Sequence, residues 1–468
     1  MPDCPPPPLL AARSTDEFRA PWPCAAERRA RAALAGRLPC QARRLGVPLR
    51  RYLAGGRGTA ATLRALDHAA GGGFYAVPPE AEHDPAAAEE TFRARGPVVD
   101  VQTHYVAHGR TGSRGAEGVL AFIQQAAPER FRGLDHRTSL SFAEYLRCLF
   151  VESETAVAVL TAAPGNATHN ILPNAEIHAT REILERTAGS GRLLHHAIVH
   201  PEVPGELEGL EALLEALRPA GLKVYTLYGS PGSPGGWMLD DPRVGRPFLE
   251  RARALGVRRV CAHKGLSGLA PTGSPRDVGP AAAAFPELDL LVYHAGYELP
   301  ARPEQPEAAF PPEGPRRGTD RLVESLAASA IPPGGNVYAE LGSTWAVLLR
   351  RPREAAHVLG KLIRAVGVEN VLWGTDSVWY GPAQPLIDAF RAFQIPEELC
   401  ERHGYPRLTP EDKQRILGSN ALRVYDIDPD GAERAARQDD LTWVGEALRE
   451  ARERGLLGDD EADGAAGP

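Results

Sequence analysis

Residues 371–376 read Val-Leu-Trp-Gly-Thr-Asp, a short apolar run that passes through a small Gly-Thr step and stops at one carboxylate. This pattern is typical of a buried parallel strand that carries an acid to the rim of an α/β barrel. Four other apolar stretches end on a histidine, namely 98–104, 193–200, 257–263 and 288–294. Histidines and an aspartate that converge from separate strand ends are what a catalytic metal site requires.

Strands and helices alternate from residue 96 onward. The stretches that predict strands are 98–106, 156–163, 193–200, 221–228, 257–263, 288–294, 336–342 and 370–376. The stretches that predict helices between them are 174–188, 206–217, 243–255, 318–328 and 352–366. This alternation favours an α/β fold closed into a (β/α)8 TIM barrel, although seven strands would give a similar pattern. The 468 residues suffice for one barrel of roughly 250 residues with additions at both ends.

The N-terminal region, residues 1–95, is rich in Pro, Arg and Ala and lacks sustained periodicity. We expect an irregular extension with short helices near 27–34 and 59–66. Its segment 50–53, Arg-Arg-Tyr-Leu, resembles a twin-arginine export signal, but charged residues interrupt the apolar region that should follow. Our hypothesis is a decayed export signal on a protein that stays in the cytoplasm.

The barrel is predicted to span 96–425, and a C-terminal helix and tail to fill 426–468. Thr409-Pro410-Glu411-Asp412 has the cap, proline and acids of a helix start, and that helix should stop near Gly418. Residues 431–456 predict a charged amphipathic helix, and 457–468 a disordered acidic tail.

Composition excludes several classes of function. A net charge of -7 without a basic stripe argues against a nucleic-acid partner. No apolar run of about 18 residues is present, so no membrane span is expected. The six cysteines are scattered, which does not indicate a disulfide framework or a zinc knuckle and favours a reducing compartment.

The candidate chemistry lies at the strand ends. Side chains alternate along a strand, so Gln102 and His104 share a face, and an inward orientation would bring both to the top of the barrel. His263, His294 and Asp376 would join them from other strands. Neutral imidazoles with one carboxylate suit one divalent metal, zinc first, with manganese or iron tolerated.

The sequence resembles the amidohydrolase superfamily, specifically its second-type branch with the aminocarboxymuconate-semialdehyde decarboxylase-like enzymes. The matching pieces are Val99-Asp100-Val101-Gln102-Thr103-His104, Cys261-Ala262-His263, Val292-Tyr293-His294-Ala295-Gly296, Trp373-Gly374-Thr375-Asp376 and Ile416-Leu417-Gly418-Ser419-Asn420-Ala421-Leu422. The resemblance implies that His104, His263 and Asp376 are metal ligands. It implies that His294 is a further ligand or the catalytic acid/base, and that Asp376 can also accept a proton from water.

Gln102 departs from this resemblance, since the family pattern on the first strand is usually His-x-His. A glutamine amide is a weak, neutral ligand, so we expect Gln102 to bind metal weakly or to orient a water from behind the ligands. Either role puts a two-metal site in doubt.

Lys223 bears on the same question. The two-metal members of the superfamily carry a carboxylated lysine on the corresponding strand. The other interpretation pairs Lys223 with a buried acid, Asp100 or Glu340, or with a substrate carboxylate.

Further residues are candidates for substrate binding because they lie at strand ends or in loops at the barrel mouth. They are His200, Lys223, Trp237, Glu340, Trp345 and Trp379. The loop 228–237 and the long connection 299–335 are predicted to fold over this mouth.

These residues favour a hydrolase that opens an amide, lactone or ester of a small molecule with a metal-activated water. The same parts permit a metal-dependent non-oxidative decarboxylase, with His294 protonating the carbon that loses carbon dioxide. A barrel that has lost catalysis and only binds a ligand is the third interpretation, favoured by Gln102 alone. The N-terminal extension and the C-terminal helix are candidate arms of a homodimer.

Overall fold

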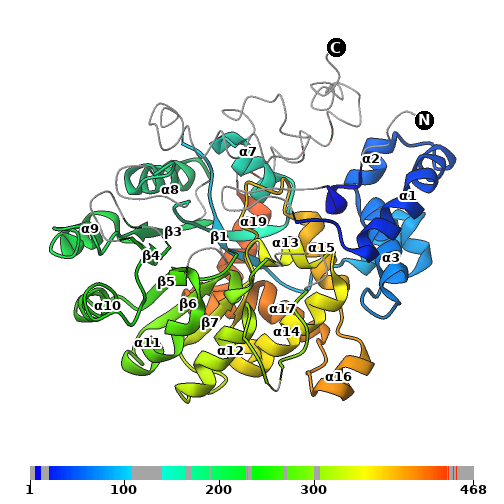
Figure 1. Ribbon diagram of the computed structural model, residues 1–468. Helices are drawn as coiled ribbons and strands as arrows, with labels where there is room; N and C mark the ends of the chain where they lie inside the picture. The colour runs from blue at the N-terminus through cyan, green and yellow to red at the C-terminus, as the bar shows by residue number, and fades with distance from the viewer. Residues whose placement is uncertain are drawn as a thin grey trace, which may run out of the picture.

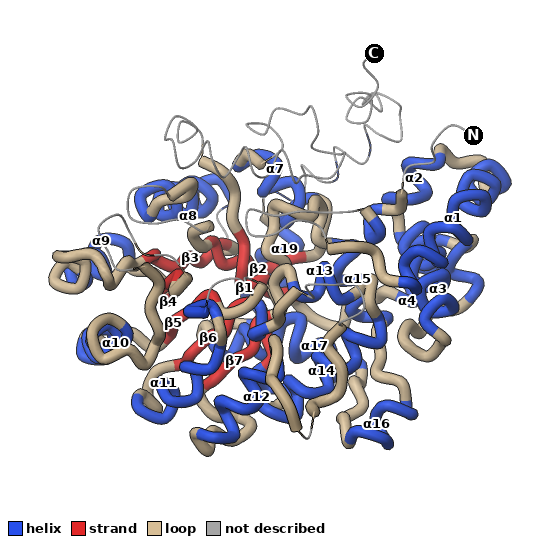
Figure 2. Tube along the Cα trace, viewed as in Figure 1, coloured by secondary structure: helices blue, strands red, loops and turns tan. Residues whose placement is uncertain are grey.

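The chain folds into a barrel of eight parallel strands surrounded by helices (Figures 1 and 2). A computed structural model describes residues 6–11, 21–107, 140–163, 170–188, 191–227, 229, 235–266, 271–299, 306–311, 313–439, 441, 446 and 450. The strands are β1 (Val98–Thr103), β2 (Thr155–Leu160), β3 (Leu193–Ile198), β4 (Gly221–Tyr225), β5 (Arg259–His263), β6 (Asp289–Tyr293), β7 (Val337–Glu340) and β8 (Val371–Leu372). Each strand pairs in parallel with the next in sequence order, which confirms the predicted (β/α)8 barrel.

Backbone hydrogen bonds between β1 and the residues around β8 bring the two ends of the sheet together. Val101 N–H donates to Trp373 O (3.1 Å), Asp376 N–H to Gln102 O (2.9 Å) and His104 N–H to Ser377 O (2.7 Å). The strands are almost entirely buried because helices cover one face and the barrel interior the other.

Every predicted strand is present, but most end earlier than the sequence suggested. The backbone leaves the extended conformation at left-handed residues, among them His294 (φ 65°), Ser343 (φ 53°) and Asp376 (φ 61°). Strand β8 has only two residues, and Asp376 lies in the segment that follows it.

The predicted helices of the outer layer are confirmed with small shifts of their ends. They are α8 (Asn174–Ala188), α9 (Leu210–Leu217), α10 (Gly245–Ala254), α12 (Thr319–Ala328) and α14 (Pro352–Val366). The structure adds α7 (Phe142–Leu146), α11 (Val278–Ala284), α13 (Thr344–Leu348), α15 (Gln384–Ala392) and α16 (Glu397–His403).

The C-terminal part of the barrel begins with α17 (Pro410–Gln414), whose Thr409 and Asp412 form the expected capping box. The expected stop near Gly418 is wrong, because a π-helical turn, Arg415–Ser419, leads into α18 (Asn420–Val424). A side chain at Gly418 would place its Cβ 1.9 Å from Pro97 O. This glycine therefore serves close packing against β1 and does not end the helix.

The N-terminal region is more helical than predicted. It forms α1 (Ala25–Arg44), α2 (Leu49–Ala54), α3 (Gly56–Ala70) and α4 (Pro85–Thr91), and of these α3 lies beside α15 (Figure 1). Helix α1 packs on α3, and α3 contacts α14 and α15 of the barrel. Local sequence gave little sign of these helices, since tertiary packing supplies most of their stability.

The Arg50-Arg51 pair lies in α2, and the neighbouring Tyr52 is buried with its hydroxyl donated to Glu82 O (3.1 Å). The decayed export signal stays a prediction. None of the helices in the described ranges has the length and apolar character needed to cross a membrane.

Several predicted segments lie wholly or partly outside the described residues. The C-terminal helix is present as α19 (Pro429–Gln438), while most of 439–456 and all of 457–468 lie outside. Most of the loop 228–237 lies outside as well. In the connection 299–335, Glu307 is held by Lys361 Nζ (2.9 Å) and by Thr319 N–H (2.8 Å).

Candidate metal centre

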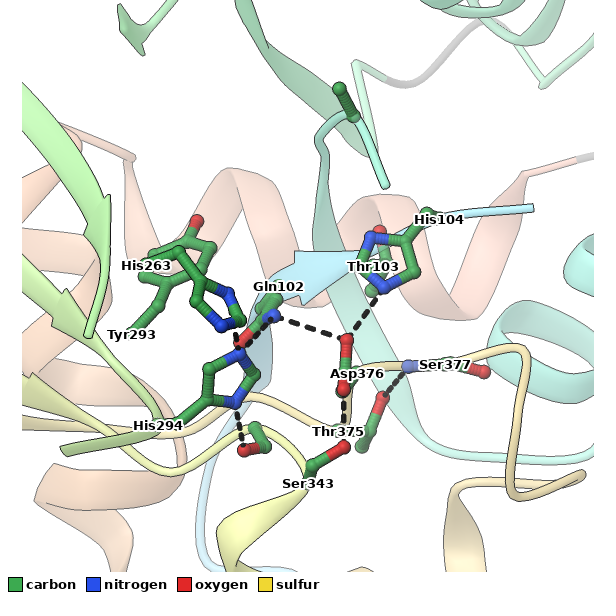
Figure 3. A network of polar contacts seen from close by, with 12 residues as sticks. Gln102, Thr103, His104, His263, Tyr293, His294, Ser343, Thr375, Asp376 and Ser377 are labelled. Carbon is green, nitrogen blue, oxygen red and sulfur yellow. Dashed lines mark hydrogen bonds and ion pairs between the residues drawn. The ribbon is translucent and has the colours of Figure 1, made fainter. Parts of the chain in front are cut away.

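The carboxyl ends of four strand regions bring five polar side chains into one buried network (Figure 3). His104 Nε2 lies 2.6 Å from Asp376 Oδ1, and Gln102 Nε2 donates to the same oxygen at 3.0 Å. Gln102 Nε2 also lies 3.4 Å from His294 Nε2, which is 3.2 Å from His263 Nδ1. The residues predicted to form the centre of the site are therefore neighbours. The Gln102 amide lies between the His104–Asp376 pair and the His263–His294 pair.

The contacts of His294 fix its tautomer. Its Nδ1 lies 2.7 Å from Gly342 O, and a carbonyl can only accept, so Nδ1 carries the proton. Burial lowers the pKa of His294 to about 4, so the ring is neutral and its Nε2 is a hydrogen-bond acceptor. His263 Nδ1 then donates to that lone pair, which leaves the lone pair of His263 on Nε2.

The charge state of the two central groups follows from their surroundings. Burial, reinforced by the neighbouring His294, holds the pKa of His263 well below its usual range. Burial alone would raise the pKa of Asp376, but His104, His294 and the Ser343 hydroxyl outweigh it and lower that pKa. Asp376 is thus an anion in the same network as the neutral rings of His263 and His294 at neutral pH.

Ser343 and Tyr380, which the sequence analysis did not predict, form a hydrogen-bond chain to the second carboxylate oxygen of Asp376, Oδ2. The Ser343 hydroxyl donates to Asp376 Oδ2, and the Tyr380 hydroxyl lies 2.6 Å from Ser343 Oγ. Because Ser343 has a single proton, Tyr380 is the donor of the second bond. The only sequence signal was the small Gly342-Ser343 step after an apolar strand, which parallels Gly374-Thr375 before Asp376.

Two buried carboxylates hold the backbone under the site. Asp100 accepts from the N–H (3.0 Å) and hydroxyl (2.5 Å) of Thr375, and burial raises its pKa to about 7. Glu340 accepts from the N–H groups of His294 (3.2 Å) and Gly342 (2.5 Å), and burial raises its pKa well above the usual range. These bonds fix the left-handed turns that aim the catalytic candidates.

The donor chemistry of the network fits a divalent cation. His104 Nδ1 and Gln102 Oε1 have no hydrogen-bond partner in the described part of the chain, whereas His104 Nε2 is paired with Asp376. However, no three His, Cys, Asp or Glu side chains among the described residues already form a set that could hold a metal ion. The Gln102 amide lies between the His104–Asp376 pair and the His263–His294 pair and donates to Asp376 Oδ1.

A family model described as amidohydrolase matches residues 99–427, which is more than half of the chain. This chain belongs to the amidohydrolase family. The match confirms the predicted resemblance and makes the protein an enzyme of that superfamily. No curated protein matches the sequence.

Solved structures similar to this amidohydrolase include an uncharacterised TIM-barrel protein from Bordetella bronchiseptica, at 14% identity and a TM-score of 0.47, covering 72% of this chain and 100% of that chain. Another is 5-carboxyvanillate decarboxylase from Sphingomonas paucimobilis, at 15% identity and 0.42, covering 71% and 99%. A third is a probable 2-pyrone-4,6-dicarboxylic acid hydrolase from Acinetobacter baumannii, at 12% identity and 0.39, covering 70% and 99%.

Among the predicted substrate contacts of the amidohydrolase, Trp379 lies beside His104. Its ring centroid is 5.8 Å from that of His104, and its buried indole N–H has no hydrogen-bond partner in the ranges described. Lys223 has its ammonium 3.5 Å from the ring centroid of Tyr293 and 4.7 Å from that of Tyr225. His200 lies on the turn after β3, 4.0 Å from a Glu202 oxygen, and burial lowers its pKa.

The remaining residues predicted to contact substrate are Trp237, Trp345 and Glu340, and each makes packing or hydrogen-bond contacts within the protein. Trp237 packs on Phe248 of α10 at 6.2 Å between ring centroids. Trp345 donates its indole N–H to Leu386 O (2.9 Å) and packs on Phe390 in the helical layer. Glu340, as described above, bonds to backbone N–H groups. Their roles toward a substrate stay predictions.

Proposed function

We propose that the protein is a metal-dependent hydrolase that opens an amide, lactone or ester of a small molecule, with His104, His263 and Asp376 as ligands of one divalent metal, zinc first. The observation that carries this proposal is the convergence of Asp376 and three imidazoles at one barrel mouth, in a chain of the amidohydrolase family. When bound, the metal would polarise the scissile carbonyl and acidify the attacking water.

The chain's own residues would transfer the proton and contact the substrate. His294 has a neutral ring whose Nε2 accepts from His263 Nδ1 (3.2 Å). In this proposal the attacking water displaces that bond, so that Nε2 takes a proton from water and returns it to the leaving group. Asp376 is an anion held by Ser343, which leaves Oδ1 facing His104. The buried indole N–H of Trp379 beside His104 is available to a substrate oxygen.

Gln102 has a defined part in this proposal. Its amide nitrogen bonds to Asp376 Oδ1 and approaches His294 Nε2, so one side chain aligns the carboxylate with the base. A metal bound to Asp376 Oδ1 would compete with this amide for the same oxygen. We therefore propose that Gln102 weakens metal binding relative to an imidazole or carboxylate at this position.

The proposal is tested by metal analysis and a substrate screen on the purified chain. We expect about one divalent metal per chain, lost in His263→Ala and in Asp376→Ala and retained in His195→Ala. His195 is a matched control because it is a buried histidine on strand β3, outside the network. Amides, lactones and esters are then screened for hydrolysis, with carbon dioxide release followed in parallel. A preparation that holds no metal and cannot be reconstituted overturns the proposal and favours a binding protein.

Release of carbon dioxide without hydrolysis would instead favour the decarboxylase. The expected homodimer and the cytoplasmic compartment stay predictions.

A further inference from the structure

The short helix α13 connects the candidate site to the N-terminal helices. Residues 342–344, where α13 begins, touch the site at three points: Gly342 O accepts from His294 Nδ1 (2.7 Å), the Ser343 hydroxyl donates to Asp376, and the Thr344 hydroxyl donates to His294 O (2.9 Å). Every residue of α13 is buried, and Ser343 has a left-handed backbone (φ 53°). A shift of α13 would therefore move the groups that aim His294 and Asp376.

The other end of α13 is held by residues 22–75, which precede the family match. The Tyr75 hydroxyl donates to Leu349 O (2.5 Å), and the Cys24 thiol donates to Arg350 O (3.4 Å). Arg351 also donates to Trp22 O (2.8 Å). Three consecutive residues, 349–351, are therefore hydrogen-bonded to the N-terminal region.

A buried charge pair adds to these contacts. Arg350 Nη1 lies 3.6 Å from Glu27 Oε1, and both side chains are at most 5% exposed. Glu27 also accepts from Arg31 Nη2 at 2.7 Å within α1. Removing one member of a buried pair leaves the other charge uncompensated, so this contact constrains where Arg350 can lie.

We propose that the N-terminal segment 21–92 is a positioning element of the site, which holds residues 349–351 and, through α13 and Ser343, fixes Asp376 and His294. The inference rests on the proposed roles of those two residues. It assigns a function to a segment outside residues 99–427, where the family model matches. A packed element with fixed contacts at both ends transmits a displacement because a close-packed interior does not deform freely.

Hydrogen–deuterium exchange on the full chain tests this coupling without substrate or metal. Tyr75→Phe removes the bond to Leu349 O and keeps the ring against Phe393. We expect exchange in peptides covering 342–351 and 374–380 to become about threefold to tenfold faster, the effect of losing one buried hydrogen bond. Tyr52→Phe is the matched control, because its hydroxyl bonds to Glu82 O inside the N-terminal segment. Equal exchange in both variants, or no change in Tyr75→Phe, overturns the inference.

Zinc affinity, measured by competition with a chelator, tests the functional consequence. Ser343→Ala and Tyr75→Phe should each weaken zinc binding severalfold, and the double variant should be no weaker than Ser343→Ala alone. Additive losses would mean that Tyr75 does not act through Ser343 and would overturn the inference. If the unmodified chain binds no zinc, the proposed function fails, and the exchange experiment alone decides the role of the N-terminal segment.

Discussion

Replacement of Gln102 by glutamate is the sharpest test of how the site is assembled. The variant is nearly isosteric, but it removes both N–H donors and places a second carboxylate about where Gln102 Nε2 now lies, 3.0 Å from Asp376 Oδ1. Two unit charges at that distance repel by about 5 kcal/mol at an effective dielectric constant of about 20. Protonation of one carboxylate relieves part of this repulsion, so we expect a net destabilisation of about 3 kcal/mol near neutral pH.

The variant should regain stability when a divalent metal is added. A cation between the two carboxylates offsets their repulsion, and it stabilises the folded state in proportion to its occupancy. In thermal unfolding with chelator present, the midpoint should fall on the order of 5 °C below that of the unmodified chain. With zinc added, the rise in midpoint should be larger for Gln102→Glu than for the unmodified chain, and its zinc affinity should be higher.

Gln414→Glu is the matched control for this experiment. Gln414 Nε2 donates to Pro97 O (3.0 Å) outside the site, so its replacement should cost stability without any zinc-dependent recovery. The reasoning is refuted if Gln102→Glu without metal is as stable as the unmodified chain. It is also refuted if zinc raises the midpoints of both chains equally.

Two further predictions concern packing and pH. Gly374→Ala should lower the free energy of unfolding by about 3 kcal/mol or more in urea unfolding, because a Cβ there would lie 1.8 Å from Glu340 Oε1. Gly36→Ala in α1, where nothing lies within 4 Å, should instead stabilise the chain by up to about 1 kcal/mol. Burial raises the pKa of Asp388 to about 7, so its folded form prefers the neutral acid, and stability should fall as pH rises from about 4 to 7. Asp388→Asn should reduce that fall by a few kcal/mol; an unchanged pH profile would contradict the assignment.

The barrel could be predicted because its strands are buried on both faces. Continuous apolar runs such as 156–160 and 290–293 are readable from sequence for that reason, and helices with one apolar stripe alternate with them. The residues at which the strands end could be predicted less accurately. Left-handed turns at His294 and Asp376 depend on bonds from Glu340 and Asp100 that join residues far apart in the chain.

The main difference from the sequence-based prediction is the helical content of the N-terminal region. Helix α1 contains Pro39 and many arginines, so its local pattern is weak, and it is stabilised by packing on α3 and by Glu27. Ser343 and Tyr380 were missed because single hydroxyl residues in loops carry no periodic signal. Their importance lies only in their contact with Asp376.

The sequence by itself determined the types and the order of the groups that can do chemistry here: one carboxylate and three imidazoles, each placed at the end of a buried strand. Only the tertiary structure decided how they face one another, because side-chain direction depends on turns and hydrogen bonds between distant segments. It showed that the Gln102 amide stands between the His104–Asp376 pair and the His263–His294 pair. It also showed that residues preceding the barrel hold the helix that carries Ser343 in place.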